Sequence, residues 1–345
     1  MQLSKKITGG AASSTGMALQ ILSVDGISAT PTAAISMGDL KQIGGGKFRP
    51  IPCPGITSNS PPTICTDKLH LMPSARAEVW VINRDANGSI INPDDSKAVL
   101  QTTGYITGIS GDAWPAIDLA QITFTGPGQS NIPKVLQIND PMHNGGSGIN
   151  NIALAKDLAT SNASVLPNAA CKPLPKGWKR RIFYGNPTID NFGLGFELVD
   201  DKGNQVPNSF QDVAAYPNAA KSICLPLGTG NTPVYEKWEL INLANEDHNF
   251  HIHQTKFRVL TAGEILDGTS GRSSKAILQD NVPILSGTVN CDGTVASWRN
   301  GSCQTTPVVV EIPFAIAGDF VFHCHILDHE DGGMMGAINI TGSAL

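Results

Sequence analysis

Short runs of alternating apolar and polar residues recur along the chain, and they limit its possible folds more than any other feature. The first series of runs begins at Ala18, Ala77, Val99 and Ala120, and the second begins at Arg180, Phe192, Glu236, Phe250, Pro307 and Phe320. A period of two residues is typical of β-strands that have one buried face. Since 36 glycines and 23 prolines are available for turns, the sequence predicts an all-β chain of short strands.

The two series of runs are separated by residues 127–176, a stretch rich in Pro, Gly, Asn and Ser with little periodicity. Such a composition is typical of a linker. We therefore expect two β-sandwich domains in tandem, at residues 1–130 and 177–345, joined by a linker at 131–176. Helices should be few; the segment SSKAILQD around Lys275 is the best candidate, and ALAKDLA within the linker is weakly helical.

Charge and hydropathy exclude several classes of partner. The net charge is -5 and no basic stripe is present, so nucleic acid is not an expected partner. No apolar run approaches the roughly 20 residues that a membrane-spanning helix needs. The first twenty residues lack the apolar core of a secretory signal, so either a signal has been removed or Met1 is not the natural start.

The seven cysteines suggest an oxidising compartment. If Cys324 binds a metal, as argued below, six cysteines remain, and Cys53/Cys65 and Cys291/Cys303 have the same separation. Two hairpin-like disulfides are plausible, with Cys171–Cys224 as the third, although six reduced thiols are the alternative. Disulfides would place the protein in the periplasm or outside the cell.

Six of the eight histidines lie in two short segments. The first segment contains His248, His251 and His253, and the second contains His323, His325 and His329 around Cys324. His70 and His143 stand alone, so each is expected to be an ordinary core or surface histidine. Clustering around a cysteine favours a metal site over six unrelated packed histidines.

Strand geometry divides these side chains into two sets, because alternate residues point to opposite faces. If the two segments are neighbouring strands, His251, His253, His323 and His325 converge on one side. Cys324 and His248 converge on the other side, where His329 and Met334 can fold back from the following turn. Met335, by contrast, is expected to be a core residue.

One cysteine with two histidines and a weak axial methionine is the ligand set of a blue-copper electron-transfer site. The thiolate is a soft ligand for copper, and imidazole suits both oxidation states. Zinc fits less well, since its structural sites usually take closed tetrahedral sets with more than one cysteine.

The two motifs resemble the C-terminal copper motifs of laccase-type multicopper oxidases. They read His248-x-x-His251-x-His253 and His323-Cys324-His325-x-x-x-His329-x-x-x-x-Met334, and the run from Gly318 to Gly336 resembles the family almost throughout. Upstream, ISMGDL, ARAEVWV and DNVPIL resemble the middle and last domains of the same family. The resemblance thus implies two tandem cupredoxin-like Greek-key β-sandwich domains.

The resemblance also implies a role for each motif residue. The ligands of the type 1 copper would be His248, Cys324, His329 and Met334. His251 would bind the type 2 copper, and His253, His323 and His325 would bind the type 3 pair. Cys324 would carry electrons to the cluster, and Glu330 would assist proton delivery to oxygen, unless Glu330 is a solvated surface carboxylate.

Half of the family's cluster ligands have no counterpart in this sequence. In the family, a first domain supplies four further histidines as two His-x-His pairs, and no such pair is present here. The missing domain is expected to be a separate chain or a lost segment; a truncated protein with the type 1 site alone is the third possibility.

The expected function is that of a laccase-like copper oxidase. Single electrons would come from phenols, aromatic amines, dyes or metal ions, and dioxygen would be reduced to water, with up to four copper ions in the complete assembly. Without a Met-rich segment, a phenol-type laccase or bilirubin-oxidase-like enzyme is favoured over a cuprous oxidase, and Asp280 is a weak candidate for a substrate contact. The alternatives are a type 1 copper electron carrier or copper-binding protein without oxidase activity, and a nitrite-reductase relative.

Overall fold

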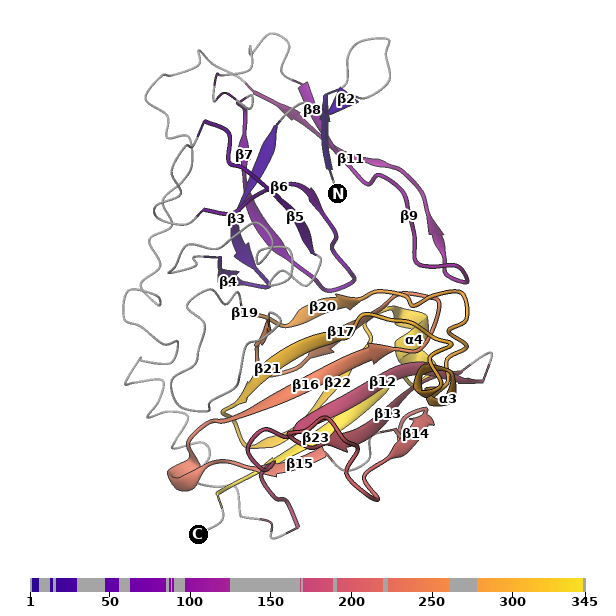
Figure 1. The fold of residues 1–345 in the computed structure, drawn as a ribbon. Helices are drawn as coiled ribbons and strands as arrows, with labels where there is room; N and C mark the ends of the chain where they lie inside the picture. The colour runs from indigo at the N-terminus through magenta and orange to yellow at the C-terminus, as the bar shows by residue number, and fades with distance from the viewer. Residues whose placement is uncertain are drawn as a thin grey trace.

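The computed structural model describes residues 2–5, 13–14, 17–29, 47–55, 63–84, 87, 89, 97–124, 168, 170–188, 191–219, 223–260 and 278–343. These residues form β-strands joined by turns, with only short helices, so the predicted all-β class is confirmed (Figure 1). Within this described part, no helix is long and apolar enough to cross a membrane. Most of the predicted linker, including ALAKDLA, lies outside it.

The N-terminal strands form one twisted sheet, which we call the N-terminal sheet. The central order is β11-β8-β1-β6-β3-β4, and β2, β5 and β7 attach to β1, β6 and β3. A separate hairpin, β9–β10, extends from this part toward the C-terminal strands (Figure 1). The bounds are β1 Gln2–Lys5, β2 Ser13–Ser14, β3 Ala18–Val24, β4 Ile27–Ser28, β5 Phe48–Ile51, β6 Cys65–Leu69, β7 Ala77–Ile82, β8 Lys97–Gln101, β9 Tyr105–Ile106, β10 Ala113–Trp114 and β11 Asp118–Thr123.

The C-terminal strands form two sheets, which we call the C-terminal sandwich. One sheet has the order β14-β13-β12-β16-β21-β18-β19, and the other has the order β15-β23-β22-β17-β20. The bounds are β12 Lys179–Thr188, β13 Asn191–Val199, β14 Gln211–Ala214, β15 Ile223–Pro226, β16 Val234–Asn242, β17 His248–Ile252, β18 Phe257–Val259, β19 Leu278–Gln279, β20 Asn281–Ile284, β21 Val308–Phe314, β22 Gly318–His323 and β23 Met335–Thr341. The short helices are η2 Thr229–Asn231, α3 Val295–Arg299 and α4 Leu327–Asp331.

The core of the sandwich lies between its two sheets. Trp238 of β16 is fully buried, and its ring centroid lies 5.2 Å from that of Phe322 in β22 and 6.1 Å from that of Phe250 in β17. These contacts join the two sheets directly, because β16 belongs to one and β17 and β22 to the other. Cys324 and Met334 belong to the same core cluster. The metal-binding motif is thus continuous with the packed interior.

Sequence periodicity located the strands well and the helices poorly. The expected helix around Lys275 is wrong where it can be judged, because Leu278–Gln279 form strand β19; its earlier residues lie outside the described part. Strand pairing with β18 outweighs the weak helical pattern there. The final predicted strand, from Phe320, stops at His323, and α4 begins four residues later. The domain division at 130 and 177 stays a prediction.

The three predicted disulfides are present. They join Cys53 to Cys65, Cys171 to Cys224, and Cys291 to Cys303. Cys324 is the only cysteine left free, and its side chain is fully buried.

The N-terminal sheet and the C-terminal sandwich meet through buried polar groups. Asp25 and Lys47 form a buried ion pair beside Asp280, and Arg76 also binds Asp280. At the β9–β10 hairpin, Gly108 forms a β-bridge with Glu246, and the Tyr105 hydroxyl donates to Asp247.

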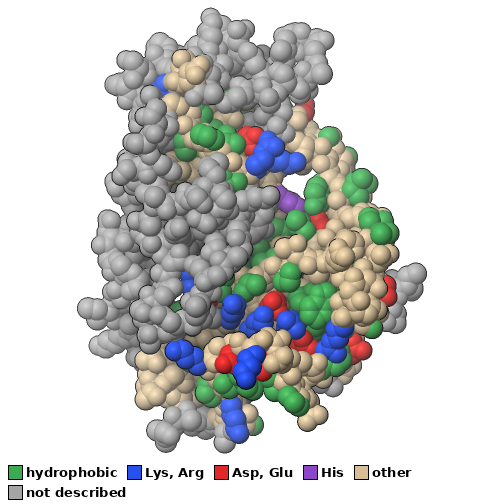
Figure 2. All heavy atoms as spheres, in the orientation of Figure 1, with side chains coloured by type: hydrophobic (Ala, Val, Ile, Leu, Met, Phe, Trp, Pro, Cys, Tyr) green, Lys and Arg blue, Asp and Glu red, His purple; other side chains and the backbone are tan. Residues whose placement is uncertain are grey.

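Figure 2 shows basic and acidic side chains gathered over the C-terminal sandwich. In the C-terminal sandwich, linked ion pairs join Lys179, Arg181, Glu197, Glu239 and Arg299.

Candidate metal centre

Neighbouring strands bring the two histidine segments together. Strand β17 pairs antiparallel with β22, with His251 opposite His323 and Ile252 opposite Phe322. Side chains along these strands therefore fall on two sides of the same sheet. Two candidate metal sites result, one on each side, and the polypeptide between His323 and His325 links them.

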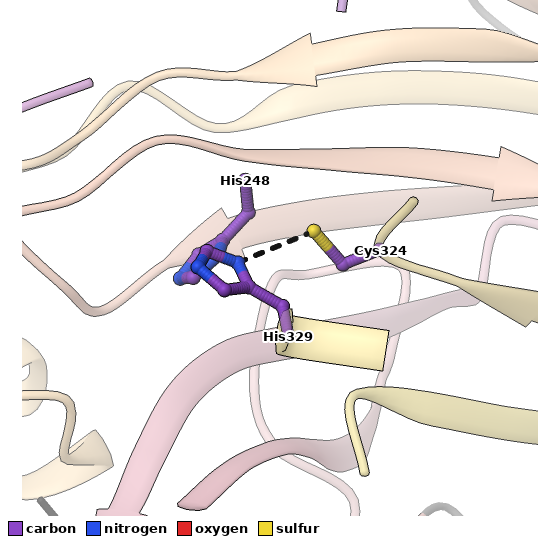
Figure 3. A group of neighbouring side chains, drawn as sticks. All are labelled: His248, Cys324 and His329. Atoms are coloured by element: carbon purple, nitrogen blue, oxygen red, sulfur yellow. Dashed lines mark hydrogen bonds between the residues drawn. The ribbon is translucent and has the colours of Figure 1, made fainter. Parts of the chain in front are cut away.

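The first site contains Cys324, His248 and His329, and we call it the thiol site (Figure 3). His248 Nδ1 lies 3.0 Å from His329 Nδ1, and Cys324 Sγ lies 3.5 Å from His329 Nδ1. All three side chains are almost completely buried. Three ligand atoms at such distances can share one ion.

The local chain path after β22 folds His329 back toward Cys324. Helix α4 carries His329 and ends at Asp331 with Gly332 as its C-cap, and Gly333 has a φ of 103°, a conformation that favours glycine. A Cβ atom at Gly333 would lie 2.7 Å from that of Ala215, so the close approach also requires glycine. The His329 carbonyl then accepts the Met334 N–H, and the Met334 carbonyl accepts the Cys324 N–H. Met334 is thereby held beside both residues, with its side chain fully buried.

The second site contains His251, His323 and His325, and we call it the imidazole site. His253 joins it, because its Nε2 lies 3.1 Å from His323 Nε2. The carboxylate of Glu330 lies 3.2 Å from His323 Nδ1 and 3.9 Å from His325 Nδ1. His253 and His325 are partly exposed to solvent, so this site opens at the molecular surface.

Burial shifts the pKa of four of these groups, namely Cys324, His248, His251 and His323. It raises the pKa of the Cys324 thiol to about 12, and it lowers the pKa of His248 well below its ordinary value. Burial also lowers the pKa of His251 to about 4 and lowers that of His323. Neutral imidazoles are ready to bind a metal ion, whereas the thiol must release its proton on binding.

The donor set fits copper. A single thiol with two imidazoles in a fully buried, partly apolar cluster matches the trigonal set of a blue-copper centre, and the buried Met334 belongs to the same core cluster. His248 Nδ1 faces His329 Nδ1, as a ligand atom would, and His248 Nε2 has no hydrogen-bond partner among the described residues.

Several functional neighbours were not predicted from the sequence. Asn249 accepts hydrogen bonds at Oδ1 from the Cys324 thiol (3.2 Å) and from the His325 N–H (2.7 Å), and its own N–H donates to Cys324 Sγ (3.5 Å). The ring of Phe192 stacks on His329 with centroids 4.0 Å apart. The Glu246 carboxylate lies 3.6 Å from His329 Nε2. Only the position of Asn249 between two ligand histidines offered a signal for its role.

Three further sequence candidates were His70, His143 and Asp280. The His70 ring packs at a tilt against that of Tyr105, with centroids 4.6 Å apart, and does not join either metal site. His143 lies outside the described residues. Asp280 lies at the imidazole site, where its carbonyl accepts a hydrogen bond from His251 Nδ1.

Two packed sheets that hold a buried thiol and two imidazoles define the C-terminal sandwich as a cupredoxin-like domain. The sequence family described as multicopper oxidase matches residues 200–343. Over these residues, the C-terminal part of this chain is therefore similar in sequence to multicopper oxidases.

Individual relatives match shorter segments of the chain. A multicopper oxidase of Staphylococcus aureus is 32% identical over 110 residues, which are 31% of this chain and 20% of that protein. A bilirubin oxidase of Albifimbria verrucaria is 37% identical over 119 residues, which are 34% of this chain and 17% of that protein. The matched segments thus span about a fifth of these relatives.

Among solved structures, a multicopper oxidase from Campylobacter jejuni, described as a metallo-oxidase, aligns with a TM-score of 0.47 and 17% identity. That alignment covers 95% of this chain and 50% of the other.

Proposed function

We propose that this chain is the electron-accepting and cluster-forming part of a laccase-like copper oxidase. Its thiol site would hold the type 1 copper through His248, Cys324, His329 and Met334. Its imidazole site would supply His251 to a type 2 copper and His253, His323 and His325 to a type 3 pair. Bound copper would supply one-electron redox chemistry at the first site and four-electron reduction of dioxygen to water at the second.

The observation that carries this proposal is the position of Cys324 between two ligands of the other site. Its sulfur belongs to the thiol site, and the adjoining residues, His323 and His325, belong to the imidazole site. An electron that arrives at the sulfur therefore needs to cross only a few covalent bonds to reach either imidazole. A site built for zinc or for structural support has no need of this connection.

Glu330 supports the proposal on the proton side. Its carboxylate lies within 4 Å of both His323 and His325 and is partly accessible to solvent. It can therefore take up protons from water and hold them beside the imidazole site. We propose this as its role in the reduction of oxygen.

The electron donor would approach the edge of His329. Glu246 faces its Nε2, and the β9–β10 hairpin, with exposed Ile106, Ile109 and Trp114, borders this region. An apolar border with a carboxylate suits small aromatic donors that lose a proton on oxidation, and it also tolerates metal ions. Phenols and aromatic amines are therefore the proposed donor classes.

The complete cluster would need four further histidines. We propose that an additional cupredoxin domain supplies them, either as a separate chain or as a segment outside this sequence. The three disulfides support a periplasmic or secreted location.

Copper counting with absorption and electron paramagnetic resonance spectra tests the proposal. The chain should take up one copper with intense blue absorption and further copper at the imidazole site. Oxygen uptake with a phenolic donor should appear once the additional domain is supplied. A single blue copper with no oxygen uptake in the complete assembly would instead identify an electron carrier, and a colourless copper complex would refute the thiol site itself.

A further inference from the structure

We propose that Asp25, in the N-terminal sheet, is a positioning residue for His251 in the imidazole site; this inference rests on the proposed function of that site. Asp25 lies in the turn between β3 and β4, more than two hundred residues before His251 in the sequence. Its side chain is completely buried, and it reaches into the C-terminal sandwich.

The Asp25 carboxylate is surrounded by backbone donors. Its Oδ1 accepts the N–H of Arg76 at 2.9 Å, and its Oδ2 accepts the N–H groups of Asp280 at 3.1 Å and Asn281 at 3.2 Å. Its charge is balanced by the ammonium of Lys47, whose side chain is 1% exposed. A buried carboxylate with a paired cation and three amide donors is strongly fixed in place.

One peptide unit connects Asp25 to His251. The peptide between Asp280 and Asn281 donates its N–H to Asp25, and its carbonyl accepts hydrogen bonds from His251 Nδ1 at 2.9 Å and from the Ile252 N–H at 3.1 Å. A peptide unit is planar, so its N–H and C=O directions are coupled. Fixing the N–H on Asp25 therefore fixes the direction of the carbonyl that holds the imidazole.

This carbonyl selects the tautomer of His251. When Nδ1 carries the proton and donates to the carbonyl, Nε2 is left free as the ligand atom facing His323 and His325. In the other tautomer, Nε2 would carry the proton, and Nδ1 and the Asp280 carbonyl oxygen would be two acceptors facing each other. Asp25 thereby favours the tautomer that binds metal.

The side chain of Asp280 provides a second link between the same parts. Its Oδ2 accepts from Arg76 at 2.8 Å and from Lys256, and Lys256 also donates to the Asp25 carbonyl at 3.0 Å. Within the described residues, the N-terminal part offers no ligand to either site. Its contacts nevertheless hold the Asp280–Asn281 peptide, which orients His251.

The tautomer of His251 can be measured without any metal. Side-chain nitrogen-15 spectra of the metal-free chain should show His251 as a single Nδ1–H tautomer, assigned by comparison with His251→Gln. In Asp25→Asn, which has one acceptor oxygen instead of two, we expect a mixture of both tautomers. Copper affinity at the imidazole site should fall at least about tenfold, while blue absorption from the thiol site persists.

Two further variants make the test decisive. Asp25→Asn combined with Lys47→Met avoids an unpaired buried ammonium, so it keeps the test valid if the single variant does not fold. Asp67→Asn, which removes an exposed ion pair of Arg49 in the same sheet, is the matched control and should change nothing at His251.

A folded double variant with an unchanged His251 tautomer and unchanged copper affinity would overturn the proposal and reduce Asp25 to a structural contact. A failure of the proposed function would look different. In that case the thiol site would not turn blue with copper, while the effect of Asp25 on the tautomer would still be seen.

Discussion

Asn249 offers the sharpest test of how the thiol site is held. Its side chain is fully buried, and it makes three contacts: with Cys324 Sγ, with the His325 N–H, and through Nδ2 with the Pro73 carbonyl at 3.3 Å. Replacing it with alanine removes the acceptor of the buried Cys324 thiol and of the partly buried His325 N–H. An unsatisfied buried polar group costs about 1–3 kcal/mol, and the small cavity adds to this.

We therefore expect Asn249→Ala to lower the free energy of unfolding by about 2–4 kcal/mol. Asn249→Asp is the matched variant, because it retains an acceptor for the His325 N–H. It also places a carboxylate where an oxygen now lies 3.2 Å from the sulfur that must become a thiolate. Because cupric copper carries one more positive charge than cuprous copper, a carboxylate about 4 Å away should favour the cupric state by about 1 to 4 kcal/mol between water and a protein surface, which is roughly five- to several-hundredfold.

Urea denaturation of the metal-free chain measures the first effect, and reductive titration of the blue absorption measures the second. The two variants should separate: alanine mainly reduces stability, and aspartate mainly lowers the reduction potential of the bound copper. If Asn249→Asp left the reduction potential unchanged, the side chain of Asn249 would not be facing the Cys324 sulfur.

Three further predictions test other parts of the structure. Cys324→Ser should abolish blue absorption but leave copper binding at the imidazole site, as seen by paramagnetic resonance; loss of both would mean that the two sites are not independent. Glu330→Gln should slow oxygen reduction in the complete assembly by about 10²-fold or more while blue absorption is unchanged, and an unaltered rate would assign Glu330 to the surface. Glu239→Gln should lower the free energy of unfolding at pH 7 by about 1–3 kcal/mol. Burial acts to raise the pKa of Glu239, but Arg181 and Lys179 outweigh it and lower that pKa. The difference in unfolding free energy between the two proteins should therefore shrink as the pH falls through the lowered pKa. A constant difference in acid denaturation curves would contradict the ion-pair role.

Local pattern was sufficient to predict how the ligand residues divide between two sites. Alternation along a strand places Cys324 opposite its neighbours, and this depends only on backbone geometry. Pairing of β17 with β22 was the one added condition, and the structure supplies it with His251 opposite His323. The equal separation of Cys53/Cys65 and Cys291/Cys303 was also informative, because a short polar stretch between two cysteines allows their side chains to meet.

Helix positions were not predictable in the same way. Residues 327 and 328 looked like the end of a strand, with His329 in the turn after it, but residues 327–331 form α4, which brings His329 to Cys324. The end of the helical pattern around Lys275 shows the opposite, because Leu278–Gln279 pair as β19 with β18. Elements this short take their conformation from their neighbours rather than from intrinsic propensity.

What the sequence alone determined is which side chains are candidate metal ligands and on which side of a strand each must lie, since covalent order and strand period are local properties. What only the tertiary structure decided is the surroundings of those ligands. Three contacts depend on how whole sheets pack: that of Asn249 with the thiol, that of Phe192 with His329, and that of Asp25 with the peptide that holds His251. No local pattern records such contacts, because hydrogen bonds between distant segments follow from the global arrangement of the chain.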